Sequence, residues 1–139
     1  MRYLGVDPGG RRMGLAVGDE STGVVSPLEV VTYDGVAAAA RRLLASAERL
    51  GAACVVLGVP ALADGSVGPA AARTDALAEE LRSLGVQVDL QSEFLSTQEA
   101  RRRARAAGRA AGRPVDDLAA QVILEEYLAG LAPSPDSAG

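Results

Sequence analysis

The run Ala53–Val59 constrains the fold more than any other stretch of this chain. Its residues, ACVVLGV, are apolar throughout, and Pro60 follows them. A strand exposed on one face alternates apolar and polar residues, whereas a strand covered on both faces is apolar without interruption. The run therefore predicts a strand inside a sheet that carries helices on both faces.

The segments around this run predict a mixed α/β sheet. The expected strands are Arg2–Pro8, Met13–Asp19, Val24–Tyr33, Ala53–Val59 and Val86–Leu90, and the expected helices are 36–50, 69–84, one beginning at Ser96, and 114–131. Pro27 places the third strand at an edge or a bulge. Three antiparallel strands followed by two β-α-β crossovers give a five-stranded sheet whose last two strands are parallel. We expect one domain over residues 1–131 and a disordered tail over 132–139.

The basic residues exclude several chemistries. The chain contains no histidine, and all 14 of its basic residues are arginine. A Ser-His-Asp triad, a Cys-His pair and a histidine metal site are therefore excluded, as are a lysine P-loop and a Schiff base. Carboxylates, hydroxyls, arginine and a bound metal remain for catalysis.

The single cysteine and the lack of long apolar runs bear on the compartment. Cys54 lies in the apolar run, so the chain cannot form an internal disulfide, and a reducing compartment is the default. No signal-peptide pattern opens the sequence, and no run approaches the ~20 apolar residues that span a bilayer. We expect a cytoplasmic protein without a membrane partner.

Arginine is concentrated in one segment of an acidic chain. The net charge is -4, yet residues 100–115 hold six arginines and no acid. Such a segment could neutralise several phosphates of a nucleic acid, or it could be the solvated face of a helix. The residues alone leave both interpretations open. The candidate nucleic-acid contacts here are Arg101, Arg102, Arg103, Arg105, Arg109 and Arg113.

Three acids are expected at the edge of the sheet where the parallel strands end. Asp7 ends the first strand, Glu93 follows the last, and Asp116 begins the last helix. Helical periodicity directs Asp116, rather than Asp117, toward the apolar seam that faces the sheet. Each acid also has a simpler explanation: a turn, a solvated loop or a helix dipole. Converging carboxylates repel one another unless a hard divalent ion lies between them, so the set predicts a metal site.

Four motifs in order give the chain a resemblance to the YqgF-type Holliday junction resolvases, also described as pre-16S rRNA processing nucleases, of the ribonuclease H-like superfamily. The match runs from Met1 to about Leu131. It rests on D-x-G-x-[KR]-R-x-G (Asp7, Gly9, Arg11, Arg12, Gly14), on G-x-P with DGS (Gly58, Pro60, Asp64, Gly65, Ser66), on SEFLST (92–97), and on VDDLAAQVIL (115–124). The sequence departs from the family where Pro8 replaces the tyrosine of DYG, and where SEFLST replaces DERxTT.

The resemblance implies a ribonuclease H-like fold and a metal-dependent endonuclease. It assigns Asp7, Glu93 and Asp116 as catalytic residues and ligands of Mg²⁺ or Mn²⁺, with two ions clamping the attacking and leaving oxygens. Arg11 and Arg12 would face substrate phosphate. The substrate would be a four-way DNA junction, a precursor 16S rRNA, or both, which links the protein to DNA recombination and ribosome biogenesis. Two symmetric nicks in a junction would suit a homodimer.

Two other functions compete with the nuclease. The spacing D-x-G-x-x-x-x-G, from Asp7 to Gly14, also resembles the phosphate-1 loop of ATP-binding proteins of the actin and sugar-kinase type. The altered SEFLST box, which lacks one acid and one arginine of the family pattern, is also compatible with a catalytically weak nucleic-acid-binding assembly factor. An ATP titration separates the first of these from a nuclease, and a cleavage assay separates the second.

Overall fold

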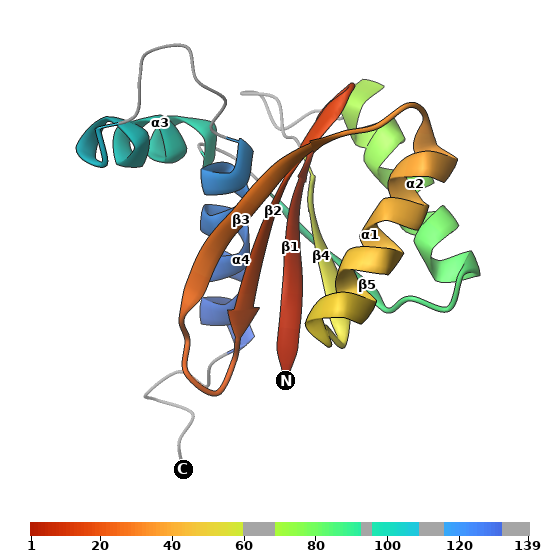
Figure 1. Ribbon diagram of the computed structural model, residues 1–139, viewed down its shortest axis with the longest axis horizontal. Helices are drawn as coiled ribbons and strands as arrows, with labels where there is room; N and C mark the ends of the chain where they lie inside the picture. Colours follow the sequence, from red (N-terminus) through yellow and green to blue (C-terminus); the bar gives the residue numbers. More distant parts are fainter. Residues whose placement is uncertain (60–68, 93–95, 109–115, 132–139) are drawn as a thin grey trace.

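The computed structural model describes residues 1–59, 69–92, 96–108 and 116–131. The elements are β1 (Arg2–Pro8), β2 (Arg12–Asp19), β3 (Val25–Thr32), α1 (Val36–Leu50), β4 (Cys54–Val59), α2 (Pro69–Ser83), β5 (Val88–Ser92), α3 (Ser96–Ala106) and α4 (Asp116–Leu131). The five strands form one sheet in the order β3-β2-β1-β4-β5 (Figure 1). The predicted α/β fold with a mixed five-stranded sheet is confirmed.

The strand pairing brings three strand ends to one edge of the sheet. β1 pairs antiparallel with β2 and parallel with β4, and β4 pairs parallel with β5. The register sets Asp7 opposite Gly14, and Val59 opposite Ser92. The carboxyl ends of β1, β4 and β5 therefore meet where β2 begins, and we call this the carboxyl edge.

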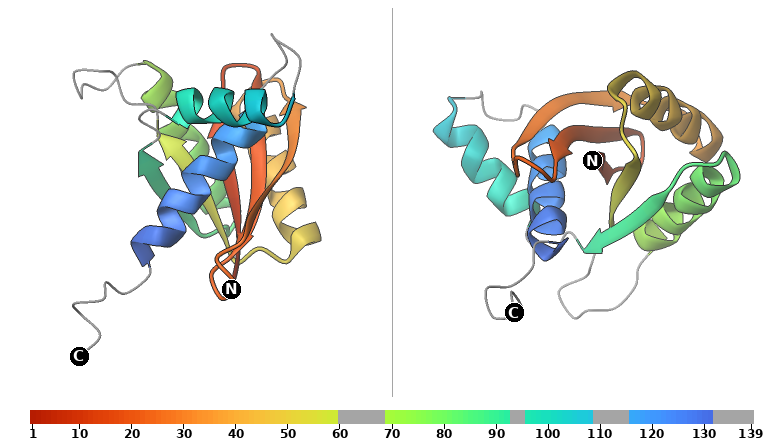
Figure 2. Two further views of the ribbon diagram at one scale, coloured as in Figure 1. Left: turned by 90° about the vertical axis from the view of Figure 1, so that its left-hand side faces the viewer. Right: turned by 90° about the horizontal axis from the view of Figure 1, so that it is seen from below.

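Helices cover both faces of the sheet because the central strands are apolar on both faces. Leu4, Val6, Val55 and Leu57 belong to the core cluster shared with α1 and α2. Their neighbours Tyr3, Cys54 and Val56 belong to a second cluster shared with α4. Figure 2, seen from below, shows α1 and α2 on one side of the sheet and α4 on the other.

The described side chains of helix α3 pack on α4. Ala100 and Ala104 of α3 form a buried cluster with Leu118 and Ala119 of α4. Small side chains at this contact let the two helices approach closely. Helix α4 is therefore enclosed between the sheet and α3, and it is buried around most of its circumference (Figure 2).

The main difference from the predicted elements is the start of β5. The sequence pattern predicts a strand from Val86, whereas β5 begins at Val88. The amide of Val86 donates instead to the carbonyl of Leu81 (3.0 Å), and Gly85, with a φ of 85°, closes α2 in a left-handed conformation. Val86, which the apolar–polar alternation placed in the strand, thus uses its amide in the C-terminal cap of α2.

Other sequence expectations are met or lie outside the described part of the chain. Pro27 lies in the edge strand β3, opposite a register shift between Leu15 and Ala16, as predicted. The predicted tail over 132–139 and the expected start of the last helix at Pro114 fall outside the described residues. Among the residues that the structure describes, no helix is long and apolar enough to cross a bilayer.

Candidate active site at the carboxyl edge

Asp7 lies on the α4 side of the carboxyl edge. Side chains alternate along β1, and Tyr3 packs in the cluster under α4. A Cβ at Gly5 would lie 2.8 Å from Leu124 Cβ of α4. Asp7 lies on the same face of β1 as Tyr3 and Gly5, near the carboxyl end of the strand, and it is half-buried. The strand therefore presents its terminal carboxylate toward the layer that α4 occupies.

Gly14 is the residue that brings α4 to Asp7. It is the antiparallel partner of Asp7, and a Cβ added to it would overlap the backbone oxygen of Asp116. A glycine inside a strand often marks such a close approach of another backbone. The first turn of α4 consequently lies directly against β2, beside the end of β1. Asp7 and Asp116 thus share one face and one edge of the sheet.

The Asp116 carboxylate accepts a hydrogen bond from Arg12 Nε in an ion pair that joins α4 to the start of β2. The Arg12 side chain is 53% exposed and that of Asp116 is 21% exposed. Because Arg12 is largely solvated, the pair holds the carboxylate in place without closing it off from solvent.

A hollow opens beside this ion pair. We call it the Asp116 hollow; it has a volume of about 240 Å³ and is lined by Gly9, Gly10, Arg11, Arg12 and Asp116. A water molecule occupies about 30 Å³ of liquid, so there is room for a divalent cation that keeps several waters. Carboxylate oxygens and water are the ligands that Mg²⁺ and Mn²⁺ prefer. The donors and space at this edge fit the predicted metal.

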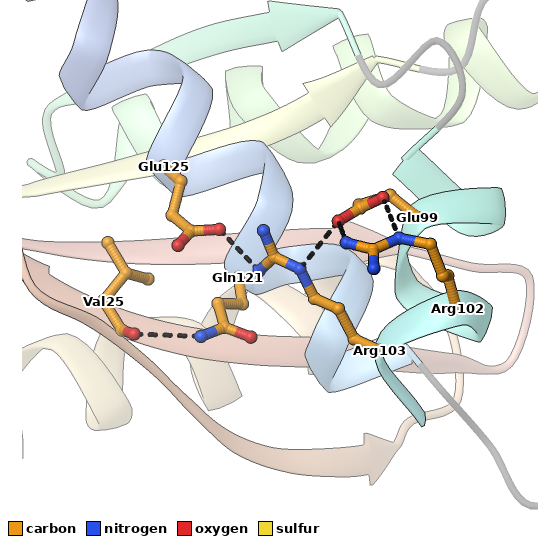
Figure 3. A network of polar contacts seen from close by, with 6 residues as sticks. All are labelled: Val25, Glu99, Arg102, Arg103, Gln121 and Glu125. Atoms are coloured by element: carbon orange, nitrogen blue, oxygen red, sulfur yellow. Dashed lines mark hydrogen bonds and ion pairs between the residues drawn. The ribbon is translucent and has the colours of Figure 1, made fainter. Parts of the chain in front are cut away.

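The prediction that Asp117 points away from the protein interior is wrong. Asp117 is buried, at 8% exposure, whereas Asp116 is half-buried at the edge. The periodicity argument assumed that only one side of the last helix is covered. Helix α4 is instead enclosed, and the face that carries Asp117 continues to Gln121, whose amide donates to the Val25 carbonyl of β3 (Figure 3).

The third predicted acid, Glu93, lies outside the described residues. The strand that precedes it, β5, runs to Ser92 at the carboxyl edge. Within the described ranges, no group of three or more acidic, cysteine or histidine side chains could hold a metal ion. Asp7 and Asp116 are therefore the two predicted ligands whose placement the structure gives.

The arginines of α3 that the sequence offered as nucleic-acid contacts differ in their environment. Arg103 is half-buried and donates to both Glu99 (3.1 Å) and Glu125 of α4 (2.6 Å), so it joins the two helices (Figure 3). Arg102 pairs with Glu99 at 2.5 Å but is 64% exposed. Arg105 is exposed and has no ion pair within the described chain. The side chain of Arg101 and all of Arg109 and Arg113 lie outside the described residues.

Glu99 serves this network. Within the described residues, its carboxylate accepts hydrogen bonds from Arg102 and Arg103. Bonding to these two guanidinium groups lowers the pKa of Glu99 to about 2. The carboxylate therefore stays charged over the whole neutral and mildly acidic range.

Sequence reasoning missed Tyr33 as a support of the glycine turn. Its hydroxyl donates to the Gly9 carbonyl, and its amide donates to the Arg11 carbonyl at 3.0 Å. Burial raises the pKa of Tyr33, so the hydroxyl remains a donor at neutral pH. The available signal was positional, since Tyr33 directly follows β3, the strand that lies beside β2 in the opening meander.

Solved structures that share this fold include nucleases of the ribonuclease H-like, RuvC type. Thermus thermophilus RuvC in complex with a Holliday junction substrate aligns with a TM-score of 0.61 and 19% identity, covering 94% of this chain and 95% of that one. Fowlpox virus resolvase in complex with Holliday junction DNA aligns with a TM-score of 0.57 and 12% identity, covering 96% of this chain and all of the other. The class that the fold defines is thus the ribonuclease H-like nuclease fold.

The sequence places the chain in a particular family of that class. The model of the family described as "RuvX: Holliday junction resolvase" matches residues 1–130, and the chain belongs to this family. A relative from Anaeromyxobacter sp. (strain Fw109-5), named "Putative pre-16S rRNA nuclease", is 42% identical over 94% of this chain and 98% of its own length. A relative of the same name from Opitutus terrae is 39% identical over 97% and 96%.

These comparisons confirm the family resemblance read from the four motifs. The protein is a nuclease, an enzyme that hydrolyses phosphodiester bonds. The ATP-binding and assembly-factor alternatives are not favoured. As a class, such nucleases depend on divalent metal, and their substrate is nucleic acid.

Proposed function

We propose that this protein is a metal-dependent endonuclease with Asp7, Glu93 and Asp116 as its catalytic residues, within a nuclease unit that comprises residues 1–131. The observation that carries the proposal is the contact at Gly14, which sets the start of α4 beside Asp7. Two acids far apart in the sequence share one edge and one face of the sheet. Glu93 enters from the sequence, as the residue after β5.

The three carboxylates would hold the cofactor, which we propose to be two ions of Mg²⁺ or Mn²⁺. When bound, the ions activate the attacking water and stabilise charge on the leaving oxygen. Asp7 is fixed by the end of β1, and Asp116 by the packing of α4 on Gly14. These two carboxylates are therefore carried by regular elements, which would preserve their geometry through the reaction.

Arg11 and Arg12 are proposed to contact the substrate phosphate from the rim of the Asp116 hollow. Both line the hollow, and Arg11 is exposed without an ion pair in the described chain. Arg12 is paired with Asp116 but mostly solvated. Its guanidinium can therefore exchange a carboxylate partner for a phosphate partner at little cost.

For the substrate we propose structured nucleic acid, either precursor 16S rRNA at its 5′ end, a four-way DNA junction, or both. The names of the relatives support the first and the family description supports the second. A homodimer is proposed for junction cleavage, because two symmetric cuts require two active sites. The cytoplasm is the compartment proposed for either role.

A cleavage assay with both substrates tests the proposal. Wild type, Asp7→Asn and the control Asp75→Asn would each receive a synthetic four-way junction and a 5′-extended 16S precursor, with Mg²⁺, Mn²⁺ or chelator. Asp75 is an exposed acid on α2, outside the site. We expect metal-dependent cleavage by wild type and Asp75→Asn, and loss of cleavage in Asp7→Asn without a change in thermal unfolding. Wild type that is inert on both substrates with either metal contradicts the proposal.

A further inference from the structure

A second hollow lies on the far side of the glycine turn from Asp116. It has a volume of about 90 Å³, and its walls include Tyr33, Val36, Arg73, Thr74 and Leu77. We call it the α1/α2 hollow, because those two helices supply half of its lining residues. Figure 1 shows the β1–β2 turn beside the N-terminal half of α2.

Gly9 and Gly10 are common to both hollows. The turn at Gly9 and Gly10 therefore separates the Asp116 hollow from the α1/α2 hollow. We call this low ridge of backbone between the two hollows the saddle. A Cβ at Gly10 would meet no atom within 4 Å, so the top of the saddle is open. The backbone at Gly10 therefore leaves room for a bound chain to pass between the two hollows.

The charges along this path favour a polyanion. Arg11 lines the Asp116 hollow, and Arg73 lines the α1/α2 hollow. Both arginines are exposed, and neither has an ion pair within the described residues. One exposed acid, Asp34, lines a third, wider hollow with Arg11 and Tyr33. Each of the two hollows that meet at the saddle thus has an exposed arginine in its wall, Arg11 beside the Arg12–Asp116 pair on one side and Arg73 on the other.

The remaining wall of the α1/α2 hollow suits a sugar edge. Val36, Ala39 and Leu77 are apolar, and Tyr33 is held still because its hydroxyl donates to Gly9. Its volume of about 90 Å³ is several times the ~10–15 Å³ that one water molecule needs. That space suits a phosphate group and the edge of its sugar.

We propose that the α1/α2 hollow is a substrate subsite, which binds a phosphodiester of the same nucleic-acid strand that is cut at Asp116. Arg73 neutralises the phosphate, and the Tyr33 ring contacts the sugar. The inference rests on the proposed function, because it takes the scissile phosphate to lie at the Asp116 hollow. Such a subsite makes the enzyme prefer a nucleic-acid strand that is long enough to reach from the Asp116 hollow across the saddle.

Equilibrium binding in the Asp7→Asn background tests this subsite without cleavage. The probes are a labelled four-way junction and a labelled 5′-extended 16S fragment, each titrated at several salt concentrations. We expect Arg73→Gln to weaken binding of at least one probe about 3- to 10-fold and to reduce the slope of log K against log salt by about 0.7–0.9, the loss of one phosphate contact. Arg73→Lys should retain most of the affinity.

Arg41→Gln is the matched control, since Arg41 is also an exposed helical arginine without an ion pair in the described chain. It should change affinity less than twofold. Gly10→Leu provides a second variant, which blocks the saddle where the backbone has room for a side chain. It should also weaken binding, with thermal unfolding unchanged. Millimolar ATP or inorganic phosphate should not displace the probe.

The outcomes separate this subsite from the nuclease proposal. If wild type cleaves but Arg73→Gln binds like Arg41→Gln, the subsite is wrong and the nuclease remains. If Asp7→Asn still cleaves while Arg73→Gln loses affinity and salt dependence, the subsite remains and the catalytic assignment fails. Displacement by ATP or phosphate, or an Asp7→Asn protein that binds neither probe, also overturns the subsite.

Discussion

At the scale of single residues, two glycines of one motif have opposite tolerance to a side chain. Gly14 lies against the backbone of Asp116, so that even a methyl group there would overlap main-chain atoms that cannot rotate away. Gly10 faces open space. Gly14 is therefore a structural part of the candidate site, because it sets how closely α4 approaches Asp7.

Gly14→Ala should lower the free energy of unfolding by about 1–3 kcal/mol, because an overpacked methyl group must displace the first turn of α4. It should also reduce cleavage by moving Asp116. Chemical denaturation of the variant measures the first effect, with Gly10→Ala as the control that leaves stability nearly unchanged. Equal stability of the two variants would mean that α4 does not contact Gly14 as described.

At the scale of elements, an ionic network fastens α3 to α4. Arg103 reaches Glu99 on its own helix and Glu125 on α4, while Ala100 and Ala104 supply the apolar contact (Figure 3). The arginine-rich helix is thus partly a structural element, and among its described arginines Arg102 and Arg105 are exposed.

The stabilising effect of Glu99 should depend on pH. Its pKa is lowered from 4.5 to about 2 by hydrogen bonds from Arg102 and Arg103, so the folded state binds its proton less readily than the unfolded state. The contribution is fully present above about pH 4.5 and is lost as the pH falls through 2. The difference in unfolding free energy between wild type and Glu99→Gln should therefore be constant from pH 7 to 5 and shrink below pH 4.5. A difference that grows on acidification would contradict the network.

The sequence predicts most elements well because their signals are local. The uninterrupted apolar run at Ala53–Val59 and the alternation in β1 and β2 follow directly from which faces are buried. The misplaced start of β5 and the misjudged Asp117 have a different origin. Both depend on tertiary neighbours, which sequence periodicity does not contain. The start of β5 depends on the cap of α2, and the burial of Asp117 depends on the covering of α4 by α3.

The sequence predicts which acids form the candidate site, but it does not predict how they are arranged in space. Asp7 and Asp116 follow from the ends of elements and from the family motifs. Their juxtaposition depends on the contact between Gly14 and α4, for which the only sequence signal is a glycine inside a strand. For Tyr33 the signal was its position after the third strand, and its hydrogen bond to Gly9 depends on how the chain packs around the turn.

At the scale of the whole molecule, Cys54 reports on the integrity of the sheet and α4. The side chain is 1% exposed in the cluster under α4, and burial raises the pKa of its thiol to about 11. Native protein at pH 8 should therefore react with iodoacetamide far more slowly than protein unfolded in urea, because both access and thiolate are lacking. Fast alkylation with unchanged circular dichroism would show that α4 leaves the sheet in the native state.

The fold brings acids from β1 and α4 to one edge of the sheet, and the central claim is that they act together as one hydrolytic site. The most direct measurement is the cleavage rate of Asp7→Asn, Asp116→Asn and the double variant under one metal condition. If the acids work as a unit, each single variant should lose about 10³-fold or more, and the double variant should be only slightly slower than either. Single variants within tenfold of wild type, or a double variant whose loss is the product of the two, would contradict the account.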